Sequence, residues 1–354
     1  MHAVRQTIGV RDVRDAGAMA SEAVTTDSGG PRVAGRVVLV HGPTGRLLLQ
    51  LHGWPHRPFW ACPGGGVEDG ESPREAAGRE LTEETGRRDE PGEELFTWEH
   101  VLVFAAEPVR QHESYFLAST DDDHVPAQAP DTADGIVRRV WTAPEDIGAL
   151  VEPVWPPDLA ARVADVVRRV HLDAVLVGGR EPAAIRVVDY DPSWPVTYRA
   201  LEARVRGALG EAALEVEHIG STSVPGLAAK PIIDALLVVA DVEDEDAYVP
   251  ALVDAGLVLR VREPGHRMLR TPARDVHLHV YAPGRPETQA YLDLRDWLRV
   301  DEADRALYER TKCDLAGRSW EDMNDYADAK SDVIAAVLAR ARAWRTGSSS
   351  TTTG

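Results

Sequence analysis

A run of glycine and charged residues constrains this chain more than any other feature of its sequence. The run reads Gly65-x5-Glu71-x7-Arg79-Glu80-Leu81-x-Glu83-Glu84-x-Gly86. Within it, the segment Ser72-Pro73-Arg74-Glu75 supplies an N-cap serine, a proline at the first helical position and a glutamate at the third, which together form a capping box. Gly86 can take the left-handed conformation that ends many helices. The run therefore predicts a helix from Ser72 to about Thr85.

The glutamates of this predicted helix lie on or beside one of its faces. Glu80 and Glu84 are four residues apart and Glu83 is three residues from Glu80, so their carboxylates are neighbours on the helix surface. Their mutual repulsion favours a cation among them. Arg79 can pair with Glu83 at i,i+4, whereas Mg2+ suits a cluster of carboxylate oxygens better.

The surroundings of these glutamates favour a metal site over the alternative, a solvated acidic helix face. A lone pair of glutamates would favour the solvated face, but here Glu71, Arg79 and two framing glycines stand at fixed spacing around them. Glycine has no Cβ and lets the backbone approach a metal or a pyrophosphate, and three glycines precede the helix: Gly64, Gly65 and Gly66.

The run resembles the Nudix box, the signature of enzymes that hydrolyse a nucleoside diphosphate linked to another moiety. The resemblance implies an α/β/α sandwich with a mixed sheet, and attack of water on a pyrophosphate phosphorus with Mg2+ or Mn2+ bound. By position, it gives the metal role to Glu80, Glu83 and Glu84, and it gives Arg79 the role of orienting these carboxylates. The loop that would contact the pyrophosphate comprises Gly64, Gly65, Gly66 and Glu71.

The general base varies across the Nudix family and often lies outside the box. Glu113, in the strand-like segment Glu113-Ser-Tyr-Phe-Leu-Ala, is one candidate, and an exposed strand residue is the alternative. Arg87 departs from the family pattern, which has an apolar residue after the last glycine, and predicts weaker local packing. Trp54, Trp60 and Trp98 could stack on a nucleotide base or pack in the core.

Composition sets the outer bounds on the molecule. The chain has 354 residues, of which 44% are apolar, which is enough for two cores. A net charge of -19 argues against broad nucleic-acid binding but is compatible with a small nucleotide substrate. No segment approaches the roughly 18 apolar residues of a membrane-spanning helix. The two cysteines, Cys62 and Cys313, carry no metal-ligand spacing, so a reduced cytoplasmic setting is expected.

The pattern along the chain predicts the order of its parts. Residues 1–30 lack sustained apolar periodicity and predict a flexible leader, with Met19 as an alternative start. Strand-like segments from Val33 onward surround the box helix and predict the Nudix sheet. The expected parts are a leader at 1–30, a Nudix domain at 31–160, a helix and linker at 161–185, a second domain at 186–343 and a disordered tail at 344–354.

The second half carries a different set of motifs. They are Asp189-Tyr-Asp-Pro-Ser-Trp194, Glu217-His218-Ile-Gly220-Ser221, Lys230-Pro-Ile-Ile-Asp234, His277-Leu-His279, Arg295-Asp-Trp-Leu-Arg299, Lys312 and Tyr326-x3-Lys330. Together they resemble the GrpB family over about residues 186–343. This resemblance implies a nucleotidyltransferase-like α/β domain with a mixed sheet, in a family whose activity is poorly defined.

Several of these motifs predict a second ligand site. Nucleotidyltransferases present a Gly-Ser turn to phosphate and aspartates on the next strand to Mg2+, and here Gly220-Ser221 precede Asp234. The position of the usual second acid holds Leu236, which puts a two-metal site in doubt. The remaining candidates for a different metal or for a phosphate are His218, Lys230, His277 and His279, with ordinary structural roles as the alternative.

Lysine is scarce in this chain. Of its 39 cationic residues only Lys230, Lys312 and Lys330 are lysines, and all three lie in the second half. Because a compact ammonium fits where the planar guanidinium does not, they are candidates for special positions, with chance placement as the alternative. The Arg295–Arg299 segment is a candidate phosphate contact or a solvated helix face.

Two functions from different classes remain. One is an Mg2+-dependent hydrolase of a small nucleotide-diphosphate substrate, joined to a nucleotidyltransferase-like domain of undefined activity. The other is a nonenzymatic nucleotide sensor in which both folds only bind ligands. The complete set of Glu80, Glu83 and Glu84 favours the hydrolase, because a binding module has no need of three clustered carboxylates.

Overall fold

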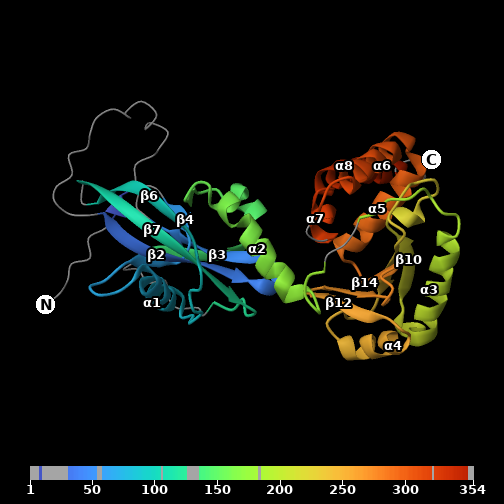
Figure 1. Cartoon of the computed structure of the whole chain (residues 1–354), viewed down its shortest axis with the longest axis horizontal. Helices are drawn as coiled ribbons and strands as arrows, with labels where there is room; N and C mark the ends of the chain where they lie inside the picture. The colour runs from blue at the N-terminus through green and yellow to red at the C-terminus, as the bar shows by residue number, and fades with distance from the viewer. Residues whose placement is uncertain are drawn as a thin grey trace. The chain divides into compact units, whose positions relative to one another are not determined.

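The computed structural model describes residues 8–9, 31–53, 58–104, 107–125, 135–181, 185–320 and 323–349 (Figure 1). The chain divides into two compact units, Met1–Ala174 and Val175–Gly354. Apart from Ile8–Gly9, the predicted leader lies outside the described residues, as do Met19 and Trp54. No helix among the described residues is long and apolar enough to cross a membrane.

The first unit is built on a mixed sheet. Strands β2 and β7 pair in parallel at its centre, and β3 and β6 flank them in antiparallel pairings. The strand order is β1-β6-β7-β2-β3-β4-β9, with β5 paired to β2 and β8 to β3. The strands are β1 Ile8–Gly9, β2 Arg32–His41, β3 Arg46–His52, β4 Phe59–Ala61, β5 Gly64–Gly66, β6 Glu94–Phe104, β7 Glu107–Thr120, β8 Ile136–Thr142 and β9 Val154–Trp155.

Helices cover both faces of this sheet. Val37 and Leu39 of β2 pack on one face against Leu81 of α1 (Pro73–Thr85). Val38 and Val40, which point to the opposite face, pack with α2 (Leu159–Val175). The alternation of side chains along a strand thus buries β2 on both faces, and Figure 1 shows the two helices on opposite sides of the sheet. The predicted α/β/α sandwich is confirmed.

Helix α1 has the ends that its sequence predicts. Ser72 is the N-cap, its side chain accepts a hydrogen bond from the Glu75 backbone, and the Glu75 carboxylate accepts one from the Ser72 backbone in return. At the other end Gly86 takes a left-handed conformation with φ of 74°. The predicted capping box and glycine stop are therefore confirmed.

The predicted end of the first domain at residue 160 is wrong. Helix α2 lies in the range predicted to be a helix and linker, yet Val163, Val166 and Val167 are buried in the core of the first unit. A short 3-10 helix at Pro144–Ala149 precedes α2. The apolar stripe of α2 needs the sheet face that α1 leaves uncovered, so α2 is part of the sandwich.

The second unit has its own mixed sheet, of order β10-β11-β14-β13-β12, in which only β11 and β14 pair in parallel. Helix α3 packs against one face, and Tyr291 of α5 packs on the other. The elements are α3 Trp194–Leu209, β10 Glu215–Ile219, β11 Ile233–Val238, α4 Val249–Asp254, β12 Val258–Glu263, β13 His266–Arg270, β14 Val276–Tyr281, α5 Pro286–Val300, α6 Glu302–Ala316, α7 Met323–Asp328 and α8 Ser331–Ser349. The predicted α/β class of this half is confirmed.

Helix α8 runs into the segment predicted to be a disordered tail. The prediction began the tail at residue 344, but α8 continues to Ser349. Trp344 lies 5.7 Å from the ring of Trp297 in α5, and Arg345 forms a 2.9 Å ion pair with Asp293. These two contacts hold the end of α8 on α5, which a polar sequence ending could not reveal. Residues 350–354 lie outside the described residues.

Candidate functional site

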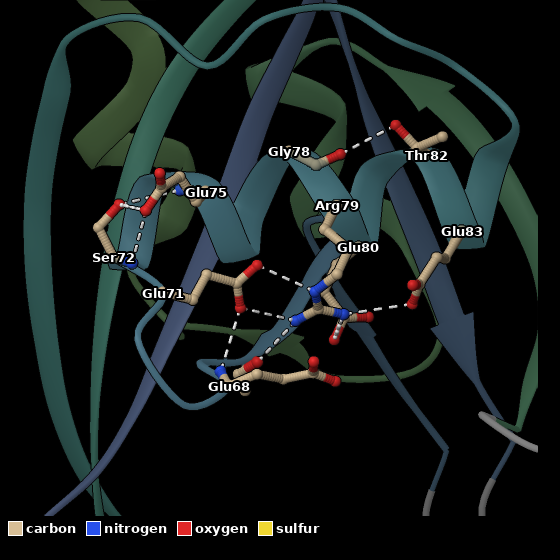
Figure 2. A network of polar contacts seen from close by, with 10 residues as sticks. Glu68, Glu71, Ser72, Glu75, Gly78, Arg79, Glu80, Thr82 and Glu83 are labelled. Carbon is tan, nitrogen blue, oxygen red and sulfur yellow. Dashed lines mark hydrogen bonds and ion pairs between the residues drawn. The ribbon is translucent and has the colours of Figure 1, made fainter.

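Arg79 is the centre of a polar network on α1 (Figure 2). Its guanidinium contacts Glu71 at 3.0 Å, Glu80 at 2.9 Å and Glu83 at 3.2 Å, which confirms the predicted i,i+4 pair. It also donates to the Gly66 carbonyl at 2.9 Å. The hydrogen bonds to Glu71 and Glu80 raise the pKa of Arg79. The bond between Arg79 and Glu71 also lowers the pKa of Glu71. Arg79 therefore orients two of the three box carboxylates.

The glycine strand β5 lies directly against the same carboxylates. The Gly64 backbone donates to Glu84 at 2.9 Å, and Glu84 is only 4% exposed. A Cβ on Gly65 would lie 2.4 Å from the Glu80 carboxyl carbon, far inside contact distance. Gly64 has a φ of 143°, which a side chain would strain. These glycines let β5 approach the helix closely enough to hold Glu80 and Glu84.

The donor set suits a hard divalent cation. Glu80, Glu83 and Glu84 offer carboxylate oxygens, the ligands that Mg2+ and Mn2+ prefer, and the missing Cβ of Gly65 leaves room for the Glu80 carboxylate. Within the described ranges the three carboxylates do not gather within 4.8 Å of one another. Arg79 contacts both Glu80 and Glu83 through one nitrogen and so lies between them.

Glu113 of β7 is not the exposed strand residue that the sequence left as an alternative. It is 1% exposed and forms a 2.8 Å ion pair with Arg36 of β2, while Tyr115 donates to it at 2.7 Å. Burial alone raises the pKa of the Glu113 carboxyl, but the charge of Arg36 and its hydrogen bonds hold that pKa well below its usual range. Such a weak base is poorly suited to accept a proton from water near neutral pH.

Sequence reasoning missed Arg36. Its guanidinium also donates to the Cys62 carbonyl at 3.0 Å, so it fastens β2 to the loop that leads into β5. The available signal was a charged residue inside the apolar segment Gly35-Arg36-Val37-Val38, at a position where burial demands a partner.

Three further predictions about this unit can be compared with the structure. Arg87 does not weaken packing, because its side chain is 8% exposed and bonds Asp89 and Thr120, each at 2.6 Å. Trp60 is fully buried in the core, so it offers no stacking surface for a base. Trp98 is partly buried and stacks on His100 with ring centroids 3.8 Å apart.

In the second unit the structure brings most of the predicted residues to one cavity of about 610 Å³. Asp234 of β11 lies beside His277 of β14 in register, with the carboxylate 3.4 Å from the imidazole. Within the described part of the chain, Asp234, His277 and His279 form the one group of three or more His, Cys, Asp or Glu whose ligand atoms lie within 4.8 Å of one another. Also lining the cavity are Gly220, Ser221 and Lys230.

Gly220 and Asp234 confirm the predicted proximity of the Gly-Ser turn to the aspartate. Gly220 has a φ of 68°, and a Cβ there would lie 2.5 Å from the Asp234 carboxylate. The position of the missing acid, Leu236, is buried in an apolar cluster. A second carboxylate for a two-metal site is therefore absent at that position.

The structure does not bring His218 to this cavity. His218 pairs with Ala235, whose side chain lies in the core on the opposite face of the sheet. Its ring stacks on Tyr198 at 4.6 Å and contacts the Thr222 hydroxyl at 3.1 Å. Burial lowers the pKa of His218 to about 4, so the ring is neutral near pH 7. His218 therefore lies outside the residues that line the cavity.

The Arg295–Arg299 segment of α5 is exposed at Arg299 and mostly buried at Arg295, and both arginines have protein partners. Arg295 is 12% exposed and pairs with Glu217 at 2.8 Å and with Asp296 at 2.7 Å. Arg299 donates to the Ser223 carbonyl at 2.9 Å. Arg295 therefore holds α5 against β10, and Arg299 holds it against the turn that follows β10.

Comparison with known proteins agrees with this division. The NUDIX domain profile matches residues 31–168, and the GrpB protein profile matches residues 184–340. A UPF0157 protein of Streptomyces coelicolor is 56% identical over 170 residues, covering 48% of this chain and 91% of the relative.

Among solved structures, the conserved protein GrpB from Enterococcus faecalis is 32% identical with a TM-score of 0.41, over 45% of this chain and 99% of that one. A NUDIX hydrolase from Nitrosomonas europaea is 24% identical with a TM-score of 0.32, over 39% of this chain and 88% of that one. From the profile matches and the Streptomyces relative, the chain belongs to the GrpB family through its second half and carries a NUDIX domain in its first.

Proposed function

We propose that the NUDIX domain hydrolyses the diphosphate linkage of a small nucleotide-derived substrate, with Mg2+ or Mn2+ held by Glu80, Glu83 and Glu84. The NUDIX domain itself supports a hydrolase. The observation that carries the finer proposal is the position of Glu80 and Glu84, which lie against the glycine strand while Arg79 orients the carboxylates of Glu80 and Glu83.

Each residue has a separate task in this proposal. Glu80, Glu83 and Glu84 would hold the ion, which when bound neutralises phosphate charge and makes a bound water more acidic. Arg79 is held in place by its bonds to Glu71 and to the Gly66 carbonyl. From that position it orients the carboxylates of Glu80 and Glu83. The strand Gly64–Gly66 presents backbone without side chains on the substrate side, where a diphosphate must approach closely.

The carboxylate set also weighs against the alternative of a nonenzymatic sensor. Placing three carboxylates near one another on one helix costs electrostatic energy, which Arg79 offsets only for those it contacts. A site that only binds a nucleotide gains nothing from this repulsion, since phosphates are themselves anionic. The same cost is justified where a cation must be held during the reaction.

The test is a hydrolysis screen of the full-length chain with nucleoside triphosphates, nucleotide sugars, dinucleoside polyphosphates and ADP-ribose. We expect Mg2+-dependent release of phosphate, pyrophosphate or a nucleoside monophosphate, abolished by EDTA and by Glu83→Gln with Glu84→Gln. Glu75→Gln is the matched control, because Glu75 lies on the same helix but bonds only the Ser72 end of it (Figure 2). Glutamine can still form a capping box there.

The outcomes separate the two functions. Turnover that survives the double glutamine change would overturn the assignment of the box carboxylates. A folded chain that binds Mg2+ and nucleotide but hydrolyses none of the panel would support the sensor instead.

A further inference from the structure

The cavity of the second unit is lined by two chemically different groups of residues. Asp234, His277 and His279 line it from the sheet, on strands β11 and β14. All three lysines of the chain, Lys230, Lys312 and Lys330, line it as well, although 36 of the 39 cationic residues of the whole sequence are arginines. A cavity of about 610 Å³ is within the range that holds a small ligand.

The side toward the sheet has the geometry of a metal site. The Asp234 oxygen and the nearest His277 nitrogen are 3.4 Å apart, and ligand atoms about 2.1 Å from one zinc ion at a tetrahedral angle are about 3.4 Å apart. The parallel register of β11 and β14 sets Asp234 beside His277, and the two-residue period returns His279 to the same face.

The type of donor identifies the class of metal. Two imidazoles and one carboxylate suit Zn2+, Co2+, Ni2+ and Fe2+, whereas Mg2+ prefers oxygen ligands and would need the acid that Leu236 replaces. Three protein ligands leave coordination positions for a water or a ligand.

A chain of hydrogen bonds behind the group orients one of these ligands. His266 of β13 contacts the Nδ1 atom of His279 through its Nε2 at 3.2 Å, and its own Nδ1 contacts the Glu263 carboxylate at 2.8 Å. With Nδ1 engaged, the Nε2 atom of His279 is the one left to bind a metal. Such a carboxylate–histidine support is typical of metal-ligating histidines. Glu263 and His266 were not among the residues that the sequence predicted.

The lysine ammonium groups converge on two tyrosines. Lys230 and Lys330 lie 5.0 Å and 4.5 Å from the centre of one ring, that of Tyr326. Lys312, which is 3% exposed, lies 4.9 Å from the ring of Tyr308 and donates to the Ala228 carbonyl. Burial, together with the charge of a neighbouring lysine, lowers the pKa of Lys312 to about 7 and that of Lys330 to about 8. Cations gathered in this way are stabilised by an anion.

We propose that Asp234, His277 and His279 bind a divalent transition metal, and that Lys230, Lys312 and Lys330 bind the phosphate group of a small phosphorylated ligand in the same cavity. The lysines predict that the ligand carries a negative charge, because their ammonium groups attract an anion. The Gly220-Ser221 turn borders the same space and adds short polar groups to the cavity wall. His266 and Glu263 are positioning residues that act through His279.

The metal half is tested with the full-length chain, freed of metal by a chelator and titrated with Co2+. Co2+ bound by imidazoles in a site of low coordination number absorbs visible light much more strongly than Co2+ held by carboxylates and water. We expect one strongly absorbing Co2+ per chain, bound at least about 100-fold more weakly after Asp234→Asn or His277→Ala. We expect a loss of about 10-fold or more after His266→Ala.

Two controls separate this site from the NUDIX domain. His112→Ala removes a partly exposed histidine of the first unit, which contacts Glu99, and should leave the absorption unchanged. Glu83→Gln with Glu84→Gln should also leave it unchanged. If folded Asp234→Asn and His277→Ala bound Co2+ with wild-type affinity and with the same strong absorption, the metal site would be overturned.

The anion half is tested by adding inorganic phosphate to the Co2+-loaded chain. We expect a saturable change in the spectrum, with a dissociation constant at least about 10-fold higher in Lys312→Met and in Lys330→Gln. Lys330 is the safer of the two positions, because it is only partly buried and lies between α7 and α8. Arg310→Met, which removes an exposed cation from the same helix as Lys312, is the matched control. Equal phosphate affinity in the wild type and both folded lysine variants would overturn the anion site.

Discussion

The ion pair between Arg36 and Glu113 places two opposite charges in the interior of the first unit. Glu113→Gln keeps the shape of the side chain but leaves Arg36 buried without its counter-charge. Losing one partner of a buried pair costs about 3 kcal/mol or more. We expect urea unfolding to show a loss of this size, with hydrolysis per folded molecule largely kept.

A second variant sharpens this prediction. Adding Arg36→Met to Glu113→Gln removes both charges, and we expect it to recover part of the lost stability, because an uncompensated charge no longer remains. If Glu113→Gln left the unfolding free energy intact and abolished hydrolysis, Glu113 would instead be the general base.

Lys312 gives the second unit a pH-dependent stability. The pKa of Lys312 is lowered from 10.5 to about 7 by burial and the charge of Lys330. Between these two values the unfolded chain binds more protons than the folded one, so stability rises with pH across that window. One pKa unit corresponds to about 1.4 kcal/mol, so the cost of burying the charge is a few kcal/mol below pH 7 and vanishes above pH 10.5.

Lys312→Met should therefore stabilise the chain more at pH 6 than at pH 9. The measurement is the difference in unfolding free energy between the variant and the wild type at the two pH values, with no phosphate or metal present. A difference that is the same at both pH values would contradict the lowered pKa. Arg310→Met, on the exposed side of the same helix, should show no such pH dependence.

At the scale of single residues, sequence spacing predicts local pairings and cannot predict burial. The Arg79–Glu83 pair follows from helix spacing alone and is confirmed. The burial of Glu113 depends on β2 and β7 pairing in parallel, which brings Glu113 beside Ala34 from 79 residues away in sequence. The sequence does not predict which face of the sheet His218 points to, because alternation along β10 fixes that face only once the strand register is known.

Among the elements, β5 and α1 form the structure that the proposed hydrolase depends on. Gly65→Ala adds one methyl group, whose position lies 2.4 Å from the Glu80 carboxyl carbon. The methyl group must push Glu80 aside, and a displacement of about 1 Å in a catalytic site can cost about 100-fold in rate. We expect a loss of this order in kcat with the fold intact by circular dichroism.

Gly207→Ala is the matched control for this change. Gly207 lies inside α3, where a Cβ would meet nothing within 4 Å. Alanine there should raise stability by about 0.5–1 kcal/mol, as it does in helix interiors, and leave hydrolysis unchanged. Wild-type kcat in Gly65→Ala would show that the close approach of β5 to Glu80 has no role in the reaction.

The boundaries of elements were predictable where local chemistry sets them. Ser72, Glu75 and Gly86 fix both ends of α1 through contacts within a few residues. The place of α2 and the length of α8 are set by distant partners: the sheet face that buries Val163, and Trp297, which contacts Trp344. Neither partner can be read from the segment itself, and both predicted boundaries were wrong.

Across the whole molecule, the two proposed metal sites consist of side-chain donors of different hardness. The NUDIX unit offers three carboxylates, and the GrpB unit offers two imidazoles and one carboxylate. Both donor types were visible in the sequence, since the glutamates fall on one helix and the histidines alternate on one strand. The sequence did not predict that the two histidines, Asp234 and the lysines would line one cavity, because β11, β14, α6 and α8 come together only in the folded unit.

The different donor sets predict that the chain sorts its metals. In a chain loaded with one Co2+, millimolar Mg2+ should support hydrolysis without reducing the visible absorption of Co2+, because oxygen ligands favour Mg2+ and imidazoles exclude it. Glu83→Gln with Glu84→Gln should remove hydrolysis and keep the absorption, and Asp234→Asn should do the reverse. Measuring both signals in the same samples checks this, and Mg2+ that displaced the absorbing Co2+ in proportion to the activity gained would show that one site binds both metals.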